Sequence, residues 1–336
     1  MPAQDVLPLS APAGVRALLV DCPAHAVTPL QDASELAAEA GIARLHLKDE
    51  RGRMGLGSFK ALGAAHAIAQ DAAAAPDCSD WATALSGRTY VTASAGNHGL
   101  SVAAGARIFG AAAVIYLADT VPEAFADRLR AKGARVMRAG AAYADSMAAA
   151  EADADANGWT LLSDSSWPGY TEPPLRVMEG YLQLAAEAAE QIDLPPTHIL
   201  LQAGVGGLAA AVAAHARSVW QDAPQIVVVE PAAAPALIES ICAGRLVDST
   251  GPVSAMGRLD CKTPSMIALA GLARDADLFV TVTEEEAAAG VATLERHGFA
   301  TTPSGAAGVA ALLAGLPDLD AGSRVMAILS EGPEDG

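Results

Sequence analysis

A lysine that follows two glycines and an aromatic residue is the part of the sequence best suited to chemistry. Lys60 stands within residues 55–63 (GLGSFKALG), where an alanine-rich helical pattern begins. Glycines let the backbone approach a ligand closely, so the amine of Lys60 can be held in a pocket. A lysine taken at random is more often a solvated surface residue. The other motifs must decide between these two interpretations.

A second candidate segment is the junction at residues 94–99 (SAGNHG), between a strand pattern and a helix pattern. The first N–H groups of a helix have no partner within it, so they attract a carboxylate or a phosphate. Ser94 and Asn97 add side-chain donors. A simple helix cap would need only one of these two residues, so the whole cluster favours an anion-binding turn.

A third candidate is the glycine-rich turn at residues 201–208 (LQAGVGGL). Its backbone N–H groups predict a phosphate cradle made by Gly204, Val205, Gly206, Gly207 and Leu208. The turn also satisfies the relaxed dinucleotide fingerprint G-x-G-x-x-A, which here ends at Ala209. Glu230 ends the next strand pattern, where a ribose-binding acid is expected. Taken alone, this segment would indicate an NAD-dependent dehydrogenase.

Three further polar residues stand next to predicted strands or helices. Asp164 follows a strand and either presents its carboxylate to a ligand or forms an Asx turn. Ser330 ends the last strand and could point into a ligand crevice, whereas Ser304 is typical of a helix N-cap. The sequence has no G-x-S-x-G elbow, phosphate-binding P-loop or H-E-x-x-H motif. Hydrolase, NTPase and zinc-protease functions therefore lack support.

The lysine, the SAGNHG turn and the glycine cradle together meet the needs of pyridoxal phosphate. This cofactor requires an amine for its Schiff base, backbone donors for its phosphate and a second anion site for the substrate carboxylate. From about residue 40 to the end, the sequence resembles the fold-type II pyridoxal-phosphate enzymes, the tryptophan synthase β-like family. Within that family it is most similar to the diaminopropionate ammonia-lyases. The matching segments are residues 57–63, 96–99, 164–170, 177–181, 256–261 and 330–332.

The resemblance implies a role for each matching residue. Lys60 would bind the cofactor, Phe59 would pack beside its ring, and Ser330 would face the pyridine nitrogen. The phosphate would lie on residues 204–208. Asn97 would bind the ring hydroxyl. The substrate carboxylate would be held by Ser94, Ala95, Gly96, Asn97 and His98.

Two positions bear on the stereochemistry of the substrate. Asp164 matches a family acid associated with the L-isomer. Ala95 stands where the ammonia-lyases carry an aspartate associated with proton abstraction from the D-isomer. The resemblance therefore implies that the acid associated with the L-isomer is retained and the one associated with the D-isomer is replaced, while the L-versus-D preference itself stays open.

The reaction implied is a β-elimination on a small β-substituted amino acid, with Lys60 or Asp164 as the base. The favoured substrate is L-2,3-diaminopropionate, which would give pyruvate and ammonia. A serine, threonine or hydroxyaspartate dehydratase with the same residues is the alternative. The NAD-dependent dehydrogenase leaves Lys60 unexplained, and a non-catalytic relative would have no use for it. We expect burial beside Phe59 to lower the pKa of Lys60.

Alternating strand and helix patterns predict an α/β fold with two open, mostly parallel twisted sheets flanked by helices. The cofactor would lie in a cleft between two domains. Residues 1–85 and 158–336 would form the large cofactor-binding domain, and 86–157 the small domain carrying the substrate-carboxylate turn. Residues 1–30 are expected to be an irregular arm, followed by a helix at 32–40 capped by Asp32 or Ser34. Expected strands are 44–49, 90–93, 113–117, 134–137, 160–162, 198–201, 226–229, 278–281 and 325–328.

The composition indicates which partners and which cellular environment to expect for this protein. The 336 residues are 52% hydrophobic and 18% charged, which indicates a globular protein. A net charge of −18 argues against nucleic acid and anionic membranes. The four widely spaced cysteines predict free thiols and no metal site: Cys22, Cys78, Cys242 and Cys261. No targeting or membrane-spanning segment is evident, so we expect a cytoplasmic enzyme, and the family implies a homodimer.

Overall fold

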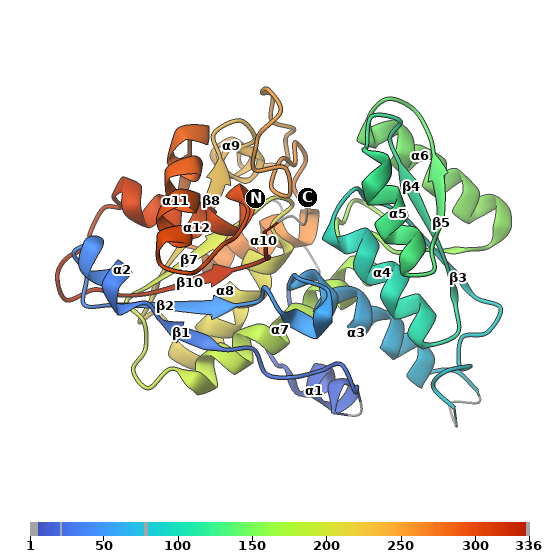
Figure 1. Ribbon diagram of the computed structural model, residues 1–336, viewed down its shortest axis with the longest axis horizontal. Helices are drawn as coiled ribbons and strands as arrows, with labels where there is room; N and C mark the ends of the chain where they lie inside the picture. The colour runs from blue at the N-terminus through green and yellow to red at the C-terminus, as the bar shows by residue number, and fades with distance from the viewer. Residues whose placement is uncertain (1–5, 21, 77–79, 334–336) are drawn as a thin grey trace.

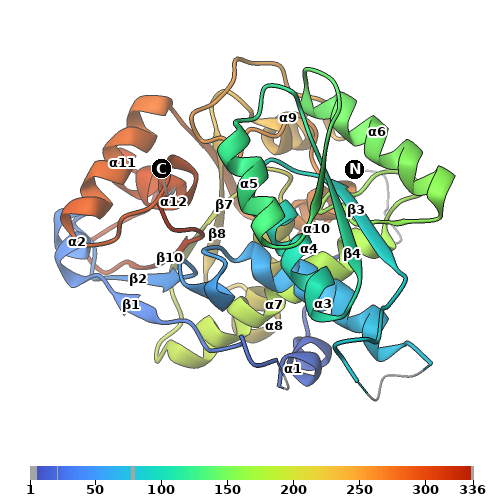
Figure 2. The same ribbon diagram turned by 45° about the vertical axis from the view of Figure 1, so that its right-hand side comes forward.

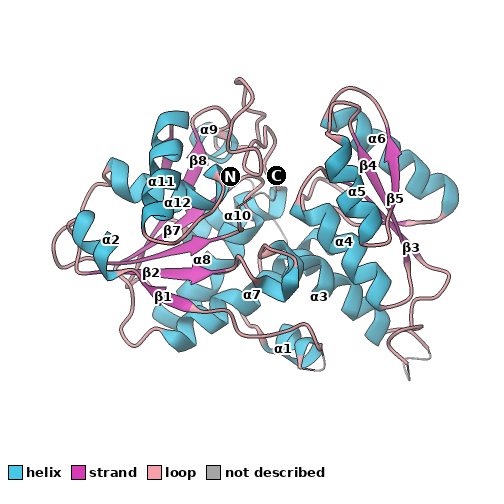
Figure 3. Ribbon diagram, viewed as in Figure 1, coloured by secondary structure: helices cyan, strands magenta, loops and turns pink. Residues whose placement is uncertain are grey.

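The chain forms two sheets covered by helices, as expected, in a computed structural model that describes residues 6–20, 22–76 and 80–333 (Figures 1 and 3). In the larger sheet only β1 runs antiparallel to its neighbour, and the remaining pairs are parallel. The six strands of the larger sheet, in spatial order, are β1 (Leu30–Asp32), β2 (Arg44–Asp49), β10 (Arg324–Leu329), β7 (His198–Gln202), β8 (Gln225–Pro231) and β9 (Leu278–Val282). The predicted fold class is confirmed.

The smaller sheet is four-stranded and entirely parallel. Its strands, in spatial order, are β5 (Arg135–Arg138), β4 (Ala112–Leu117), β3 (Thr89–Ala93) and β6 (Thr160–Leu161). Its helices are α4 (Asn97–Ile108), α5 (Glu123–Ala131) and α6 (Tyr143–Asn157). Together they lie on the right in Figure 1, with the larger sheet on the left, and the turned view of Figure 2 brings them forward. The sequence predicts that the small domain ends at residue 157. Strand β6 pairs with β3, so the smaller sheet extends beyond that predicted boundary, to Leu161.

Both faces of the larger sheet are buried, which explains its continuous apolar strands. Along β7, Ile199 and Leu201 face one hydrophobic cluster, whereas Leu200 faces the other. The first cluster includes α1 (Ala13–Leu19), α3 (Lys60–Ala73), α7 (Glu172–Gln191), α8 (Gly207–Trp220), α9 (Ala236–Ala243) and α10 (Met266–Asp275). The second includes α2 (Ser34–Glu39), α11 (Glu284–Arg296) and α12 (Pro303–Ala314).

Helices α3 and α7 touch through two glycines. A Cβ atom on Gly63 would lie 2.7 Å from the ring of Tyr181 and 2.7 Å from the side chain of Val177. A Cβ atom on Gly180 would lie 2.8 Å from the Cα of Gly63. Only glycine fits at this crossing, so the backbones meet and Tyr181 lies against the first turns of α3.

Three local expectations are wrong. The expected irregular arm contains α1, which buries Val15 and Leu19. The helix expected from residue 32 begins at Ser34, because Asp32 pairs with β2 as part of β1, and no side chain caps it. Ser304 does not cap α12. The chain enters that helix at Pro303, so the cap is the preceding residue, Thr302, whose side chain accepts the Gly305 N–H at 3.0 Å.

Cys22, Cys242 and Cys261 are free thiols, and Cys78 lies outside the described residues. Among residues 6–20, 22–76 and 80–333, no helix is long and apolar enough to cross a membrane. The same residues contain no group of three or more His, Cys, Asp or Glu side chains placed to hold a metal ion.

Candidate active site

Lys60 and Asp164 meet although they lie 104 residues apart in the sequence. Lys60 opens α3, and Asp164 follows β6 of the smaller sheet. The Lys60 Nζ donates a hydrogen bond to the Asp164 Oδ2 and forms an ion pair with it. The two residues predicted to act on the substrate Cα proton therefore form one acid–base pair.

The pair sets the protonation of both groups. Burial alone would lower the pKa of Lys60, but the charge of Asp164 and its hydrogen bond raise this pKa above the ordinary value. Burial alone would raise the pKa of Asp164, but the charge of Lys60 lowers it well below the ordinary range. Our expectation of a lowered lysine pKa is wrong, because it considered the apolar neighbours and not this carboxylate. Both groups are charged near neutrality.

Two aromatic rings flank the amine. The Nζ of Lys60 lies 5.2 Å from the ring centre of Phe59 and 5.7 Å from that of Tyr181. The two rings meet edge to face with centres 4.9 Å apart. Burial raises the pKa of Tyr181 to about 12, so its phenol is neutral. The sequence alone assigns no role to Tyr181, whose only signal is its place in the matching segment 177–181.

The SAGNHG turn is shaped by its own serine. The Ser94 Oγ accepts the N–H groups of Gly96 at 3.3 Å and Gly99 at 3.1 Å. A Cβ atom on Gly99 would lie 2.8 Å from the Ser94 carbonyl oxygen, so glycine is needed there. The hydroxyl oxygen therefore organises the turn, and the hydroxyl hydrogen can still be donated to a ligand. That Ser94 holds a substrate carboxylate stays a prediction.

His98 links this turn to the segment that carries Asp164. Its Nε2 lies 2.8 Å from the Leu162 carbonyl oxygen. A carbonyl can only accept, so Nε2 carries the proton. Burial lowers the pKa of His98, which is therefore neutral. Sequence reasoning considered only the backbone of His98 and missed this contact of its side chain.

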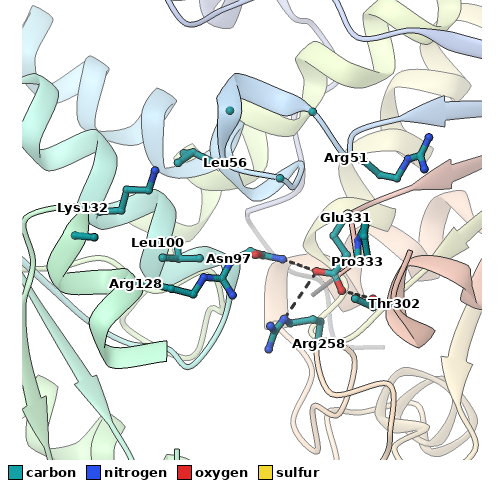
Figure 4. A pocket seen from close by; sticks show the side chains of 15 residues that line it. Arg51, Leu56, Asn97, Leu100, Arg128, Lys132, Arg258, Thr302, Glu331 and Pro333 are labelled. Carbon is teal, nitrogen blue, oxygen red and sulfur yellow. Dashed lines mark hydrogen bonds and ion pairs between the residues drawn. The ribbon is translucent and has the colours of Figure 1, made fainter. Parts of the chain in front are cut away.

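Asn97 joins a buried carboxylate that sequence reasoning did not assign. The Nδ2 of Asn97 donates to the Glu331 Oε2, and the Oγ1 of Thr302 donates to the Glu331 Oε1. The Nε of Arg258 lies 3.8 Å from the Glu331 Oε2 (Figure 4). Arg258 also donates from Nη1 to the Ala95 carbonyl oxygen at 3.2 Å. Matching segments 256–261 and 330–332 were the only signals for Arg258 and Glu331.

The glycine cradle lies where β7 ends and α8 begins. Gly206 is the N-cap residue with φ +97°, a conformation that favours glycine. A Cβ atom on Gly204 would lie 2.9 Å from the Cys261 Sγ and 3.1 Å from the Arg258 carbonyl oxygen. The first N–H groups of α8 have no acceptor within the helix, which suits a phosphate. Burial and the charge of Asp164 raise the pKa of Cys261 to about 12, so this neighbouring thiol is neutral.

Ser330 lies at the end of β10 and is 4% exposed. Its Oγ accepts a hydrogen bond from the Gln202 Nε2 at 3.2 Å. Its carbonyl oxygen accepts the N–H of Phe59 at 3.1 Å, which ties the approach to Lys60 to the larger sheet. Gln202 ends β7 and lies within the segment 201–208, but the predicted cradle begins at Gly204, so sequence reasoning gave Gln202 no role.

Glu230 has a structural role that opposes the dinucleotide interpretation. Its side chain is completely buried and accepts the N–H groups of Leu237 and Ile238, each at 2.8 Å. Burial raises its pKa to about 7. These contacts hold the start of α9 and leave the carboxylate inaccessible to a ribose.

A cavity of about 460 Å³ borders the Asn97–Glu331 contact (Figure 4). Its lining includes Gly57 and Asn97, from the two turns, but neither Lys60 nor the glycine cradle. The basic side chains that line it are Arg51, Arg128, Lys132 and Arg258.

Comparison with known proteins agrees with this geometry. The sequence model that describes the family of pyridoxal-phosphate dependent enzymes matches residues 22–331 of this chain. The chain belongs to this family. It is 33% identical to a diaminopropionate ammonia-lyase of Salmonella typhimurium, a match that covers 92% of this chain and 86% of the relative. A serine dehydratase-like protein of Rattus norvegicus is 31% identical over 72% of this chain and 67% of its own.

Solved structures show the same relationship. The Escherichia coli diaminopropionate ammonia-lyase in complex with D-serine superposes with a TM-score of 0.88 at 29% identity, covering 98% of this chain and 90% of that one. The same enzyme with an aminoacrylate–pyridoxal phosphate azomethine intermediate gives a TM-score of 0.86. This member of the pyridoxal-phosphate dependent enzymes therefore shares the fold-type II architecture.

The residues of this chain fit the cofactor of the family. Lys60 supplies a primary amine, and the start of α8 supplies backbone donors beside a position where only glycine fits. Asn97 and Ser330 offer a side-chain amide and a hydroxyl at neighbouring points. Pyridoxal phosphate needs this set of donors.

Proposed function

We propose that this chain catalyses a pyridoxal-phosphate-dependent β-elimination on a small β-substituted amino acid. The favoured substrate is L-2,3-diaminopropionate, with pyruvate and ammonia as products. The observation that carries the proposal is the Lys60–Asp164 pair beside a glycine cradle. The relative from Salmonella typhimurium, a diaminopropionate ammonia-lyase, supports the substrate because the match covers 92% of this chain.

The cofactor supplies an electron sink for the carbanion at the substrate Cα. Lys60 would hold it through its amine, residues 204–208 would hold its phosphate, and Asn97 and Ser330 would face its ring. The turn at residues 94–98 would orient the substrate carboxylate. In the Lys60–Asp164 pair the Asp164 Oδ2 carries no proton, so it can accept one from Cα. Lys60 Nζ can act as the base once it has passed its own proton to Asp164.

A dehydratase acting on serine, threonine or hydroxyaspartate is the second candidate. The serine dehydratase-like relative, 31% identical over 72% of this chain, favours it. The two reactions differ in the leaving group at Cβ and use the same apparatus. The homodimer and the cytoplasmic location remain predictions from the sequence and the family resemblance.

The test is to purify the protein with pyridoxal phosphate and record its visible absorption. We expect a visible band that borohydride bleaches, with the pyridoxyl adduct mapped to Lys60 and absent from Lys60→Ala. Release of 2-oxo acid from L- and D-diaminopropionate, serine, threonine and hydroxyaspartate then ranks the substrates. A colourless protein that binds NAD and takes up no pyridoxal phosphate would overturn the proposal.

A further inference from the structure

Glu331 is attached to both functional turns of the site. Its backbone forms a bridge with Ser58, and the N–H of the following residue, Gly332, donates to the Gly57 carbonyl oxygen at 3.0 Å. Ser58 lies two positions before Lys60. The Glu331 side chain meanwhile accepts a hydrogen bond from Asn97, on the other side of the cavity (Figure 4). One residue thus connects the lysine turn to the anion-binding turn.

Both oxygens of the Glu331 carboxylate are used, and its side chain is only 6% exposed. One oxygen accepts from Asn97 and the other from Thr302. Two acceptors are therefore required at this position, which a carboxylate provides and an amide does not. A glutamine would turn an N–H group toward one of the two donors, and one contact would be lost.

The contact fixes the orientation of the Asn97 amide. An amide nitrogen carries two hydrogens, and one of them is committed to Glu331. The direction of this bond therefore sets where the second hydrogen and the amide oxygen point. Arg258 restrains the same turn from the other side of Gly96, by donating to the Ala95 carbonyl oxygen. A Cβ atom on Gly96 would lie 3.3 Å from the Arg258 side chain, so the packing is close.

We propose that Glu331 is a positioning residue that acts through Asn97, with Arg258 as its support. It holds the turn at residues 94–98 at a fixed distance from Lys60, so that a substrate bound by its carboxylate presents Cα to the Lys60–Asp164 pair. This inference rests on the proposed function, because it assumes that the turn binds the substrate carboxylate. A purely structural Glu331 would affect stability alone.

The experiment compares the holoenzyme with Glu331→Gln. We expect the variant to keep the visible band, while KM for the best substrate and the dissociation constant of L-alanine each rise about tenfold, the effect of one lost hydrogen bond to a charged group. L-Alanine has no leaving group at Cβ, so its titration of the visible band measures binding alone. Glu230→Gln is the matched control. It changes another buried carboxylate, which holds the start of α9 and contacts neither the lysine turn nor the turn at residues 94–98, and it should leave both constants unchanged.

A double-mutant cycle tests whether the effect passes through Asn97. Adding Glu331→Gln to Asn97→Ala should cause no further loss of L-alanine affinity, since the partner is already gone. If Glu331→Gln does not fold, Arg258→Met tests the same turn and should raise both constants about threefold. Wild-type values of KM and L-alanine affinity in these variants, with only the melting temperature lowered, would overturn the inference. A colourless wild-type protein would overturn the proposed function and this inference together.

Discussion

The chemistry at the residue scale depends on the ion pair between Lys60 and Asp164. Each group cancels the burial penalty of the other, so an amine that burial would neutralise keeps its proton. The two side chains are equally and only partly accessible, each 20% exposed. A substrate can therefore still reach the pair, which can take up or release a proton.

Asp164→Asn tests this pair. Removing the charge takes away what raises the pKa of Lys60, so burial should then lower it. We expect the visible band of the cofactor to persist and 2-oxo acid release from the L-substrate to fall about 10²–10⁴-fold, the usual contribution of a general base. Absorption spectra and a coupled keto-acid assay measure the two quantities.

Asp153→Asn is the control for that variant, because Asp153 also accepts a hydrogen bond but from Tyr116, on the smaller sheet. It should retain full activity. Full activity in Asp164→Asn would show instead that Asp164 has no part in proton transfer.

At the scale of elements, the crossing of α3 and α7 determines where Lys60 lies. Gly63 and Gly180 let the two backbones touch, and this contact places Tyr181 beside the lysine amine. The length and polarity of the two helices follow from local sequence. Their close approach depends on two glycines more than a hundred positions apart, Gly63 and Gly180, which come together only in the folded protein.

Gly180→Ala should therefore destabilise the protein by about 1–3 kcal/mol, the usual cost of forcing a methyl group into a packed interior. Its new Cβ would lie 2.8 Å from backbone atoms that cannot move independently. Gly14→Ala in α1 has nothing within 4 Å of the added Cβ, and it should be neutral or gain up to about 1 kcal/mol. Urea unfolding of both variants measures the difference. Equal stability would exclude a tight crossing.

At the scale of the whole molecule, a buried charge cluster ties the N-terminal arm to the sheet and to α7. Glu187 accepts hydrogen bonds from Lys48 at 2.8 Å and from Arg53 at 2.7 Å. Arg53 also binds both oxygens of Glu50 at 2.7 Å and the Thr28 hydroxyl at 2.8 Å. Two positive and two negative side chains thus neutralise one another away from water. The cluster fixes the start of the turn that leads to Lys60.

Glu187→Gln should lower the free energy of unfolding at pH 7 by about 3–5 kcal/mol, because it leaves buried cations without their counter-ion. Arg53 and Lys48 lower the pKa of Glu187, against the opposing effect of burial, from 4.5 to about 2. The unfolded chain therefore binds this proton more readily than the native protein does. The contribution is complete above about pH 4.5 and is lost as the pH falls toward 2.

Denaturation at several pH values measures the free energy of unfolding of wild type and Glu187→Gln. The difference between the two should narrow as the pH falls from about 4.5 toward 2. Glu190→Gln is the control in the same helix. Glu190 pairs with Arg16 at the surface, where its side chain is 62% exposed, so less than about 1 kcal/mol is expected. A constant difference across the window would contradict the assigned cause.

The sequence by itself determined the fold class, the cofactor and the position of Lys60 at the start of a helix after a glycine-rich turn. These follow from local signals: apolar strands that must be buried on both faces, and glycines placed at strand-to-helix turns. Local signals also gave a wrong prediction. They favoured Ser304 as the cap of α12, but that helix begins at Pro303 and its cap is Thr302. A pattern read along the chain cannot show which of two neighbouring hydroxyls faces the helix.

Only the tertiary structure decided how the groups act on one another. The pKa of Lys60 depends on Asp164, and the direction of the Asn97 amide depends on Glu331. Glu230, which the sequence presents as a possible ribose-binding acid, is buried and holds the start of α9. Electrostatic and hydrogen-bond energies fall off steeply with distance, and distance between segments is not written in sequence spacing. Lys60, Asp164 and Asn97 could therefore be named from the sequence, whereas their protonation and orientation required the fold, and so did the contacts of Glu331 and Gln202.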